Sequence, residues 1–286
     1  MRTVITIIVL ALVVVLSKVN AQDFQGIATY KTHRDLHIKM DSTKINSEMQ
    51  TKMMEMMKKQ FQKTFNLTFN KESSLYKEEV SLDKPQTGMG GEFQVVMVGN
   101  GGESDVLYKN TKDQRYADQK DTMGKIFLVK DEIEKIDWTL ESETKYIGEY
   151  QCYKATYKKQ VEVFNDSGFN SESETKKEDE NKEPEMVERI VTAWYTPQIP
   201  INNGPEMYQG LPGLILEIHD GKLTVICSKI VLNPEEKIEI KKPTKGKQVN
   251  QEKYDEIMEK KEKEMMERFR PKKGREGEGI SITIGG

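Results

Sequence analysis

Histidine and cysteine are scarce in this chain, which has three histidines and two cysteines among its 286 residues. These side chains supply most zinc sites and many catalytic bases and nucleophiles. So small a number excludes disulfide-rich scaffolds and leaves few candidates for a metal site. His33 and His37 are four residues apart, but the glutamate of a helical zinc-protease motif does not accompany them. We therefore predict no bound metal and no cofactor.

Catalytic signatures are missing as well. The sequence has no Gly-x-Ser-x-Gly elbow, no cysteine–histidine signature and no EF-hand loop. Its glycine-rich segment at residues 99–105 lacks the lysine and hydroxyl residue of a phosphate-binding loop. We predict no catalytic residue, and a binding protein is favoured over an enzyme. A hydrolase whose site only geometry would reveal stays open.

Long apolar runs are absent beyond the first 21 residues, and a bilayer-spanning helix needs roughly 20 such residues. The 44 basic and 47 acidic side chains are interleaved and give a net charge of −3. No basic stripe is therefore available for nucleic acid. With an apolar content of 36%, the composition indicates a well-solvated surface around a thin, β-rich core.

Residues 1–21 have the three parts of a secretory signal peptide. Arg2 supplies the positive charge, residues 4–16 form the apolar segment, and Ala21 ends an acceptable cleavage site. A membrane anchor is the alternative, but the apolar segment is short for one. We predict an exported protein that begins at Gln22 after cleavage. The periplasm is the favoured location, with secretion or outer-membrane association as alternatives.

The most informative stretch covers residues 204–218, where three glycines and two prolines in ten residues precede an apolar strand. Pro212 and Gly213 suit the two central positions of a type II turn, in which glycine takes a positive φ. Residues 214–218 then alternate as a strand. The Asp-Gly pair at residues 220–221 predicts a tight hairpin turn into the next strand.

The sequence resembles the GLPGLI family of exported proteins from Gram-negative bacteria, whose defining hexapeptide lies inside this stretch. Shorter segments are similar too, at residues 26–30, 148–155, 193–196 and 280–284. The resemblance implies an envelope location and a β-rich fold. It carries over no catalytic residue, because the family has no assigned biochemical role. The motif consists of Gly210, Leu211, Pro212, Gly213, Leu214 and Ile215.

Residues 47–63 predict an amphipathic helix that begins at a capping box formed by Ser47 and Gln50. Its apolar residues recur at helical spacing, and nearly all are methionine. Methionine fills irregular gaps in a core, which is the simplest role for such a stripe. The alternatives are an adaptable surface for an apolar ligand or partner and, more weakly, a thioether site for Cu(I). The stripe consists of Met49, Met53, Met56, Met57 and Phe61.

Short alternating runs separated by turn residues indicate a single β-rich domain over residues 22–240. Residues 166–184 have almost no apolar side chains and predict a disordered insertion. Residues 241–286 predict a connector, a charged helix capped by Asn250, and a terminal strand at residues 280–284. The expected fold class is α+β, mainly antiparallel β: one large curved, half-barrel-like sheet, the methionine-rich helix packed on it, and the charged helix near the C-terminus.

Cys152 and Cys227 both lie in strand-like runs. In an oxidising compartment such a pair is a disulfide candidate, and the bridge would stabilise the fold by roughly 3–5 kcal/mol. The alternative is two separate buried thiols, and the resemblance to the GLPGLI family includes only the first cysteine. Both alternatives remain open.

These observations favour a non-catalytic binding or accessory protein of the cell envelope, which holds an apolar ligand or a partner segment on its curved sheet. The alternative is an interaction module that docks on an outer-membrane protein through its terminal strand. The candidate ligand-binding residues are the methionine stripe and two aromatic residues further on: Met49, Met53, Met56, Met57, Phe61, Trp194 and Tyr208.

Overall fold

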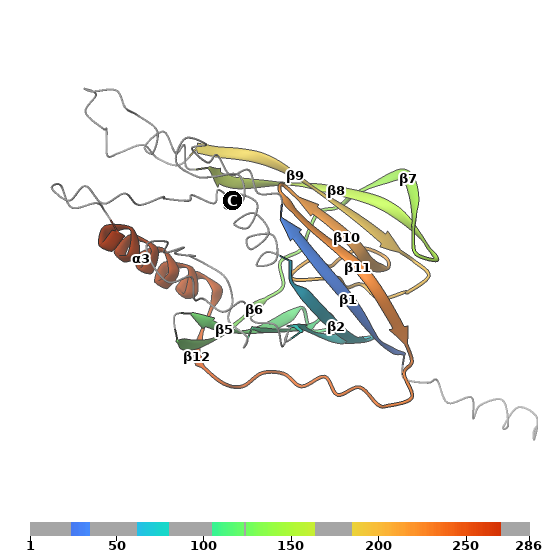
Figure 1. Ribbon diagram of the computed structural model, residues 1–286, viewed down its shortest axis with the longest axis horizontal. Coiled ribbons are helices and arrows are strands. Elements are labelled where there is room, and N and C mark those ends of the chain that lie inside the picture. Colours follow the sequence, from blue (N-terminus) through green and yellow to red (C-terminus); the bar gives the residue numbers. More distant parts are fainter. Residues whose placement is uncertain (1–23, 35–61, 80–104, 123, 164–184, 270–286) are drawn as a thin grey trace, which may run out of the picture.

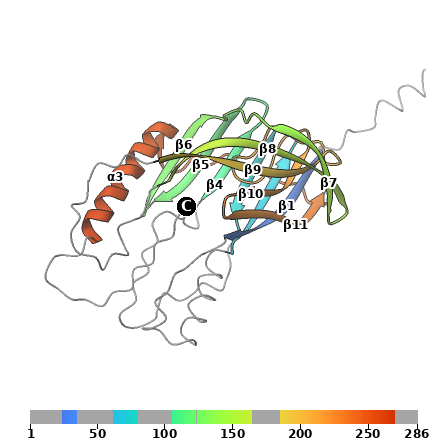
Figure 2. The same ribbon diagram turned by 90° about the horizontal axis from the view of Figure 1, so that it is seen from above.

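The structure is a computed structural model that describes residues 24–34, 62–79, 105–122, 124–163 and 185–269. Within these residues the chain forms one open, curved sheet of twelve strands with a single helix at one end (Figures 1 and 2). The strands are β1 (Gln25–Arg34), β2 (Thr64–Asn70), β3 (Ser73–Glu78), β4 (Val106–Asn110), β5 (Arg115–Thr122), β6 (Lys125–Glu132), β7 (Thr139–Ile147), β8 (Tyr150–Val163), β9 (Glu185–Thr196), β10 (Leu214–Asp220), β11 (Leu223–Leu232) and β12 (Lys247–Val249).

The sheet consists of two antiparallel meanders joined by the first strand. Its order is β12-β6-β5-β4-β3-β2-β1-β11-β10-β9-β8-β7. One meander runs from β2 to β6 and the other from β7 to β11, and β1 pairs with β2 on one side and with β11 on the other. The short β12 runs parallel to β6. Strands β12 and β7 lie at opposite ends of the order, so the sheet is not closed.

The fold class expected from the sequence was wrong. We expected a mainly antiparallel, half-barrel-like sheet with two helices; the described residues form a mixed, open sheet with one short helix, α3 (Gln251–Phe269). The parallel strand was missed because residues 247–249 were assigned to a connector, and local sequence does not reveal that they return to the far end of the sheet. Antiparallel pairing itself is confirmed for every other pair of neighbouring strands in the described part.

Several predicted segments fall outside the described residues. These are the signal peptide at residues 1–21, the terminal strand at residues 280–284 and the insertion at residues 166–184. The methionine-rich helix also lies outside them, apart from residues 62 and 63, which are not helical.

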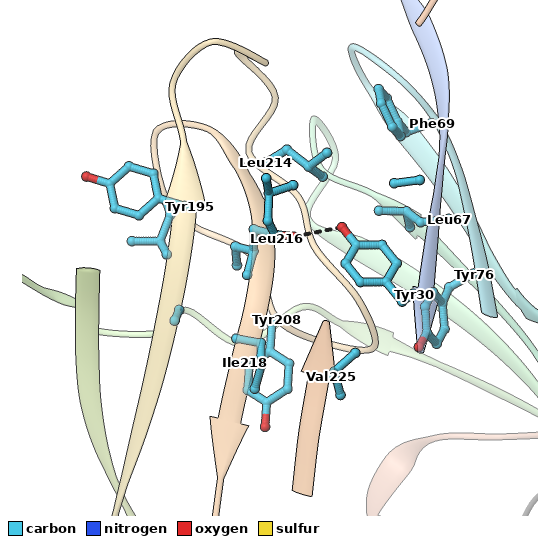
Figure 3. Close-up of a cluster of buried hydrophobic side chains, with 14 of the residues drawn as sticks. Tyr30, Leu67, Phe69, Tyr76, Tyr195, Tyr208, Leu214, Leu216, Ile218 and Val225 are labelled. Carbon is cyan, nitrogen blue, oxygen red and sulfur yellow. Dashed lines mark hydrogen bonds between the residues drawn. The ribbon is translucent and has the colours of Figure 1, made fainter. Parts of the chain in front are cut away.

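The core lies on one face of the sheet, where alternate residues of neighbouring strands point inward (Figure 3). The Tyr30 hydroxyl donates to the Ile215 carbonyl at 2.7 Å and links β1 to β10. The rings of Phe65 and Tyr76 stack 4.8 Å apart. Every residue from Leu214 to Ile218 is buried, so the strand predicted after the motif is confirmed as the centre of the core.

Helix α3 packs on the β6 end of the sheet through a small apolar stripe. Its predicted cap is confirmed, because the Asn250 side chain accepts a hydrogen bond from the Lys253 amide at 3.1 Å. Tyr254 is buried, lies edge-on to Phe127 and has its hydroxyl 2.9 Å from that of Thr122. Of the helical residues the structure describes, no run is both long and apolar enough for a bilayer crossing.

Candidate functional site

The loop that contains the glycine-proline motif, residues 197–213, is held in place by a buried lysine of the sheet. Lys109 of β4 is 0% exposed. Its ammonium donates to the carbonyls of Gly204, Glu206 and Tyr208 at 2.8, 2.6 and 3.3 Å. Three acceptors match the three protons of an ammonium group. Lys109 therefore fixes the path of this loop.

The same contacts show that the loop crosses the concave side of the sheet. Strands β4 and β10 are five steps apart in the strand order, which is roughly 24 Å in a flat sheet. The loop touches both, because Lys109 of β4 binds its carbonyls and the Tyr208 hydroxyl donates to Asp220 of β10 at 2.8 Å. The loop is also held by Trp138, whose indole donates to the Gln209 carbonyl at 2.8 Å. The chain's own loop thus fills this part of the concave side.

The glycines of the motif serve the loop in two different ways. Gly210, not Gly213, has the positive φ, at 100°, so the predicted type II turn is wrong. The Gly213 amide donates to the Leu211 carbonyl at 2.8 Å, as in a γ-turn centred on Pro212. Glycine is required at position 213 because a Cβ there would lie 2.2 Å from the Thr196 carbonyl oxygen. The cause is crowding against β9, which a local pattern does not reveal.

A polar cluster joins this loop to the ends of three strands. Asp220 pairs with Lys159 through a short contact, lies 3.6 Å from the Arg189 guanidinium and accepts the hydrogen bond from Tyr208. Burial alone would raise the pKa of Asp220, but the hydrogen bonds from Lys159 and Tyr208 hold it below its ordinary value. Burial and the nearby Asp220 charge raise the pKa of Tyr208. The carboxylate is therefore ionised and the phenol is a donor, an arrangement that ties strands together.

Trp194, the other aromatic candidate, lies on the opposite face of the sheet. It pairs with Glu217 across β9 and β10, and the Lys145 ammonium is 4.4 Å from its ring centroid. Lys145 also binds Glu217 at 2.7 Å, and His219 contacts the same carboxylate. Glu217 and Asp220 are three residues apart in a regular part of β10, so their side chains point to opposite faces. The structure therefore does not bring Trp194 and Tyr208 together.

The remaining predicted site residues are accounted for as follows. The methionine stripe, with Phe61, lies outside the described residues. Cys152 and Cys227 are buried free thiols, and burial raises their pKa values to about 11 and about 12. Both are therefore protonated and unreactive at neutral pH, and their oxidation to a disulfide stays a prediction. In the part of the chain that the structure covers, no set of three or more His, Cys, Asp or Glu side chains is placed to hold a metal.

Two exposed surfaces were not predicted from the sequence. The first, which we call the arm, consists of residues 158–163 of β8 and residues 185–190 of β9. These residues pair with each other, whereas the pairing of β10 with β9 starts only at Val191 and that of β7 with β8 stops at Thr156. Figure 1 shows the two strands running on past the end of β10. The arm exposes Met186 (54%), Val187 (41%) and Ile190 (57%).

The second exposed surface is the edge strand β7, at the opposite end of the sheet from α3 (Figure 2). Among the described residues it pairs only with β8. Leu140 and Tyr146 on this strand are 58% and 72% exposed. The signal for both surfaces was present in the sequence as apolar residues in strands. Their exposure depends on strand order for β7 and on strand length for the arm, which local sequence does not reveal.

Comparison with known proteins gives a family match over part of the chain. Residues 138–217 match a family described as a protein of unknown function, Porph_ging. The matched region includes the segments at residues 148–155, 193–196 and 210–215 that carry the GLPGLI resemblance, and it is consistent with that type of family. No curated protein matches the chain.

Two solved structures resemble the fold distantly, and both are of PNGF-II, in space groups C2 and P21. Their TM-scores are 0.45 and their sequence identities 13% and 15%. The matches cover 83% and 82% of this chain but 33% of the PNGF-II chains, so this chain spans about a third of their length. We transfer nothing from these structures to this protein.

The buried Lys109 makes stability depend on pH. Burial lowers its pKa to about 7, whereas an unfolded lysine titrates at about 10.4. Between these values the unfolded chain keeps a proton that the folded chain has released, so the free energy of unfolding rises with pH. We expect wild type to gain up to ~1.4 kcal/mol per pH unit relative to Lys109→Met over this range.

Urea unfolding of wild type and Lys109→Met, from about pH 6 to about pH 10, measures this difference directly. Titration of groups that do not interact with Lys109 cancels, because both proteins share them. Glu206 is the exception, since burial raises its pKa and the nearby Lys109 charge lowers it. A difference that stays constant, or that falls as pH rises, would show that the three loop carbonyls keep Lys109 charged despite its burial.

Proposed function

We propose that this protein is an exported, non-catalytic accessory protein of the cell envelope that binds an extended segment of a partner protein. The binding site is the arm, and binding occurs by addition of a strand to it. The arm carries this proposal because it presents apolar side chains and strand edges that no described residue covers. The resemblance to the GLPGLI family and the signal peptide predicted at residues 1–21 support the envelope location.

The arm is suited to strand addition for a physical reason. A two-stranded ribbon is marginally stable in water by itself, and a third strand stabilises it. The residues of β9 that pair with residues 158–163 of β8 have their second edge open, from residue 185 to Ile190. An unpaired edge of this kind is a template for another chain. The segment that fits has apolar side chains at alternate positions, to cover Met186 and Ile190.

The base of the arm is rigid, which favours binding. Lys159 and Arg189 face each other across β8 and β9 where the arm leaves the sheet, and both bind Asp220. Arg189 also packs over Gly221, where a Cβ would lie 3.2 Å from its guanidinium carbon. The polar cluster described above therefore fixes the arm to the core. A site held in this way loses less entropy when a partner binds.

Between the two ligands expected from the sequence, a partner segment is favoured over an apolar ligand on the curved sheet. The loop of residues 197–213 fills the concave side between β4 and β10 with its own buried contacts. Of the eight large apolar residues that are exposed in the described chain, seven lie on strands, three of them on the arm, and Met207 lies on the loop.

A peptide with the sequence of residues 279–285 tests the proposal, because its three isoleucines alternate. We expect it to bind the full chain and to protect the amides of residues 185–190 from hydrogen exchange. Ile190→Lys should weaken binding roughly tenfold or more, since a buried isoleucine contributes about 1.5–3 kcal/mol.

Ile226→Lys is the matched control. Ile226 is 39% exposed but lies on β11, which is paired on both sides, so binding should be unchanged. A peptide of the same composition with its isoleucines grouped together should not bind. Equal binding of the two peptides, or protection that does not include the arm, would overturn the proposal.

A further inference from the structure

The edge strand β7 has a sequence that is complementary to itself. It reads Thr-Leu-Glu-Ser-Glu-Thr-Lys-Tyr-Ile from residue 139 to residue 147. A second copy of the strand can be placed antiparallel to the first, centred on residue 143. Each residue then lies opposite a residue of the copy, and the two residue numbers sum to 286. The pairs are Thr139 with Ile147, Leu140 with Tyr146, Glu141 with Lys145, and Ser142 with Thr144.

The apolar pair in this arrangement explains two exposed side chains. Leu140 and Tyr146 are 58% and 72% exposed and are separated by an even number of residues. In the antiparallel arrangement each lies opposite the other residue of the copy, so the contact occurs twice. Cross-strand pairs between an aromatic and an aliphatic side chain stabilise a sheet. No described residue of the same chain covers the exposed parts of these two side chains.

The charged pair adds selectivity. Glu141 and Lys145 have opposite charges and would lie opposite each other twice in the same dimer. Both point to the face on which Lys154 binds Glu141 at 3.0 Å and Lys145 binds Glu217 at 2.7 Å. A copy laid in parallel would place like charges opposite each other, which is destabilising. The charge pattern therefore favours the antiparallel arrangement.

The middle of β7 differs from its flanks. Between Leu140 and Thr144 its pairing with β8 shifts register, so regular pairing is continuous only on either side. The regularly paired flanks are residues 139–140 and 144–147, and in the antiparallel arrangement residues 139 and 140 lie opposite residues 147 and 146. Glu141 lies within the irregular part. The central Glu143 would face its own copy, but Lys154 binds it at 2.9 Å and offsets the repulsion.

From these observations we propose that β7 is a dimerisation edge, at which two copies of this chain pair their β7 strands antiparallel about a two-fold axis near Glu143. The sheet then continues from one molecule into the next, and the interface is the same surface on both. This surface is separate from the arm, so the dimer does not depend on the function proposed above. A single pair of strands buries less than a standard interface of roughly 1,600 Å², so we expect the dimer to have a dissociation constant of roughly 10–100 µM.

Two single charge variants provide the test, by sedimentation velocity over a range of concentrations. Glu141→Lys places two lysines opposite each other, and Lys145→Glu places two glutamates opposite each other. We expect each variant alone to dimerise at least tenfold more weakly than wild type. When the two variants are mixed, both opposed pairs become complementary, and the heterodimer should form with near wild-type affinity.

The mixture separates pairing from damage to the fold, because a misfolded edge would not be rescued by another altered protein. Lys229→Glu, an exposed substitution on the interior strand β11, is the control and should dimerise as wild type does. A wild type that stays monomeric at the highest concentrations, single variants that dimerise normally, or a mixture that stays monomeric would each overturn the proposal. Peptide binding at the arm should be unaffected by Glu141→Lys, so the two proposals can fail independently.

Discussion

Gly213→Ala is expected to lower the free energy of unfolding by about 4 kcal/mol, a value typical of forced backbone displacement in a core. The new Cβ would lie 2.2 Å from the Thr196 carbonyl oxygen and 2.5 Å from its carbonyl carbon. Both atoms belong to the backbone at the end of β9, where Thr196 pairs with Leu214. Neither atom can move without breaking that pairing, so the loop and β10 would shift together. Urea unfolding measures the loss.

Gly148→Ala is the control for this variant. Gly148 has a φ of 60°, and a Cβ there meets nothing within 4 Å. The substitution should therefore cost only the left-handed backbone conformation, about 1–2 kcal/mol. If Gly213→Ala were no more destabilising than Gly148→Ala, the loop would be free to move away from β9, and its role as a fixed element of the core would be wrong.

Lys109→Met is expected to lower the free energy of unfolding by about 3 kcal/mol near pH 8, because the buried carbonyls around the Lys109 amino group lose their donor. Methionine fills much of the space but donates no hydrogen bond. The carbonyls of Gly204, Glu206 and Tyr208 would then have to find other donors in a place from which the loop excludes solvent. Hydrogen exchange should show the loss at residues 203–213 before it reaches β4.

Lys77→Met on the neighbouring strand β3 is the matched control, because Lys77 is exposed. We expect it to change stability by less than about 0.5 kcal/mol, as surface substitutions usually do. Equal stability of Lys109→Met and Lys77→Met would mean that the loop keeps its place without the lysine. Only the hydrogen bonds of Trp138 and Tyr208 would then hold the loop across the concave side of the sheet.

Gly213 and Lys109 show why the centre of the structure was only partly predictable from the sequence. The strand at residues 214–218 and the hairpin after it follow from alternation and from an Asp-Gly pair, which are local signals. The turn lies one residue later than predicted, because Asp220 is the last residue of β10 and Gly221 takes the first turn position with a φ of 59°. The reason for Gly213 is contact with Thr196, 17 residues earlier in the chain, and no local pattern reports such a contact.

Lys109 was missed for a related reason. A lysine in a strand is normally expected to point to solvent. One clue was present, since Leu107 and Lys109 are two residues apart and therefore share a face. Only the position of the loop shows that this face is closed and that carbonyl groups, not water, surround the ammonium.

The candidate binding surfaces were likewise predictable only as far as local sequence signals determine them. Composition and motifs pointed to the methionine stripe, Trp194 and Tyr208. The structure places Tyr208 in a buried hydrogen bond with Asp220 and Trp194 on the other face. The arm is defined by the lengths of neighbouring strands and β7 by its place at the edge of the sheet, so alternation within one strand could not identify them.

The sequence by itself determined that this chain forms strands, where its central hairpin turns and where α3 begins, because alternation, turn residues and a capping side chain act over a few residues. The tertiary structure alone decided the strand order, the parallel β12, the closing of the hollow by the loop and the exposure of the arm and β7. Each of these depends on contacts between residues far apart in the chain, and their free energies are set by packing that no short segment contains.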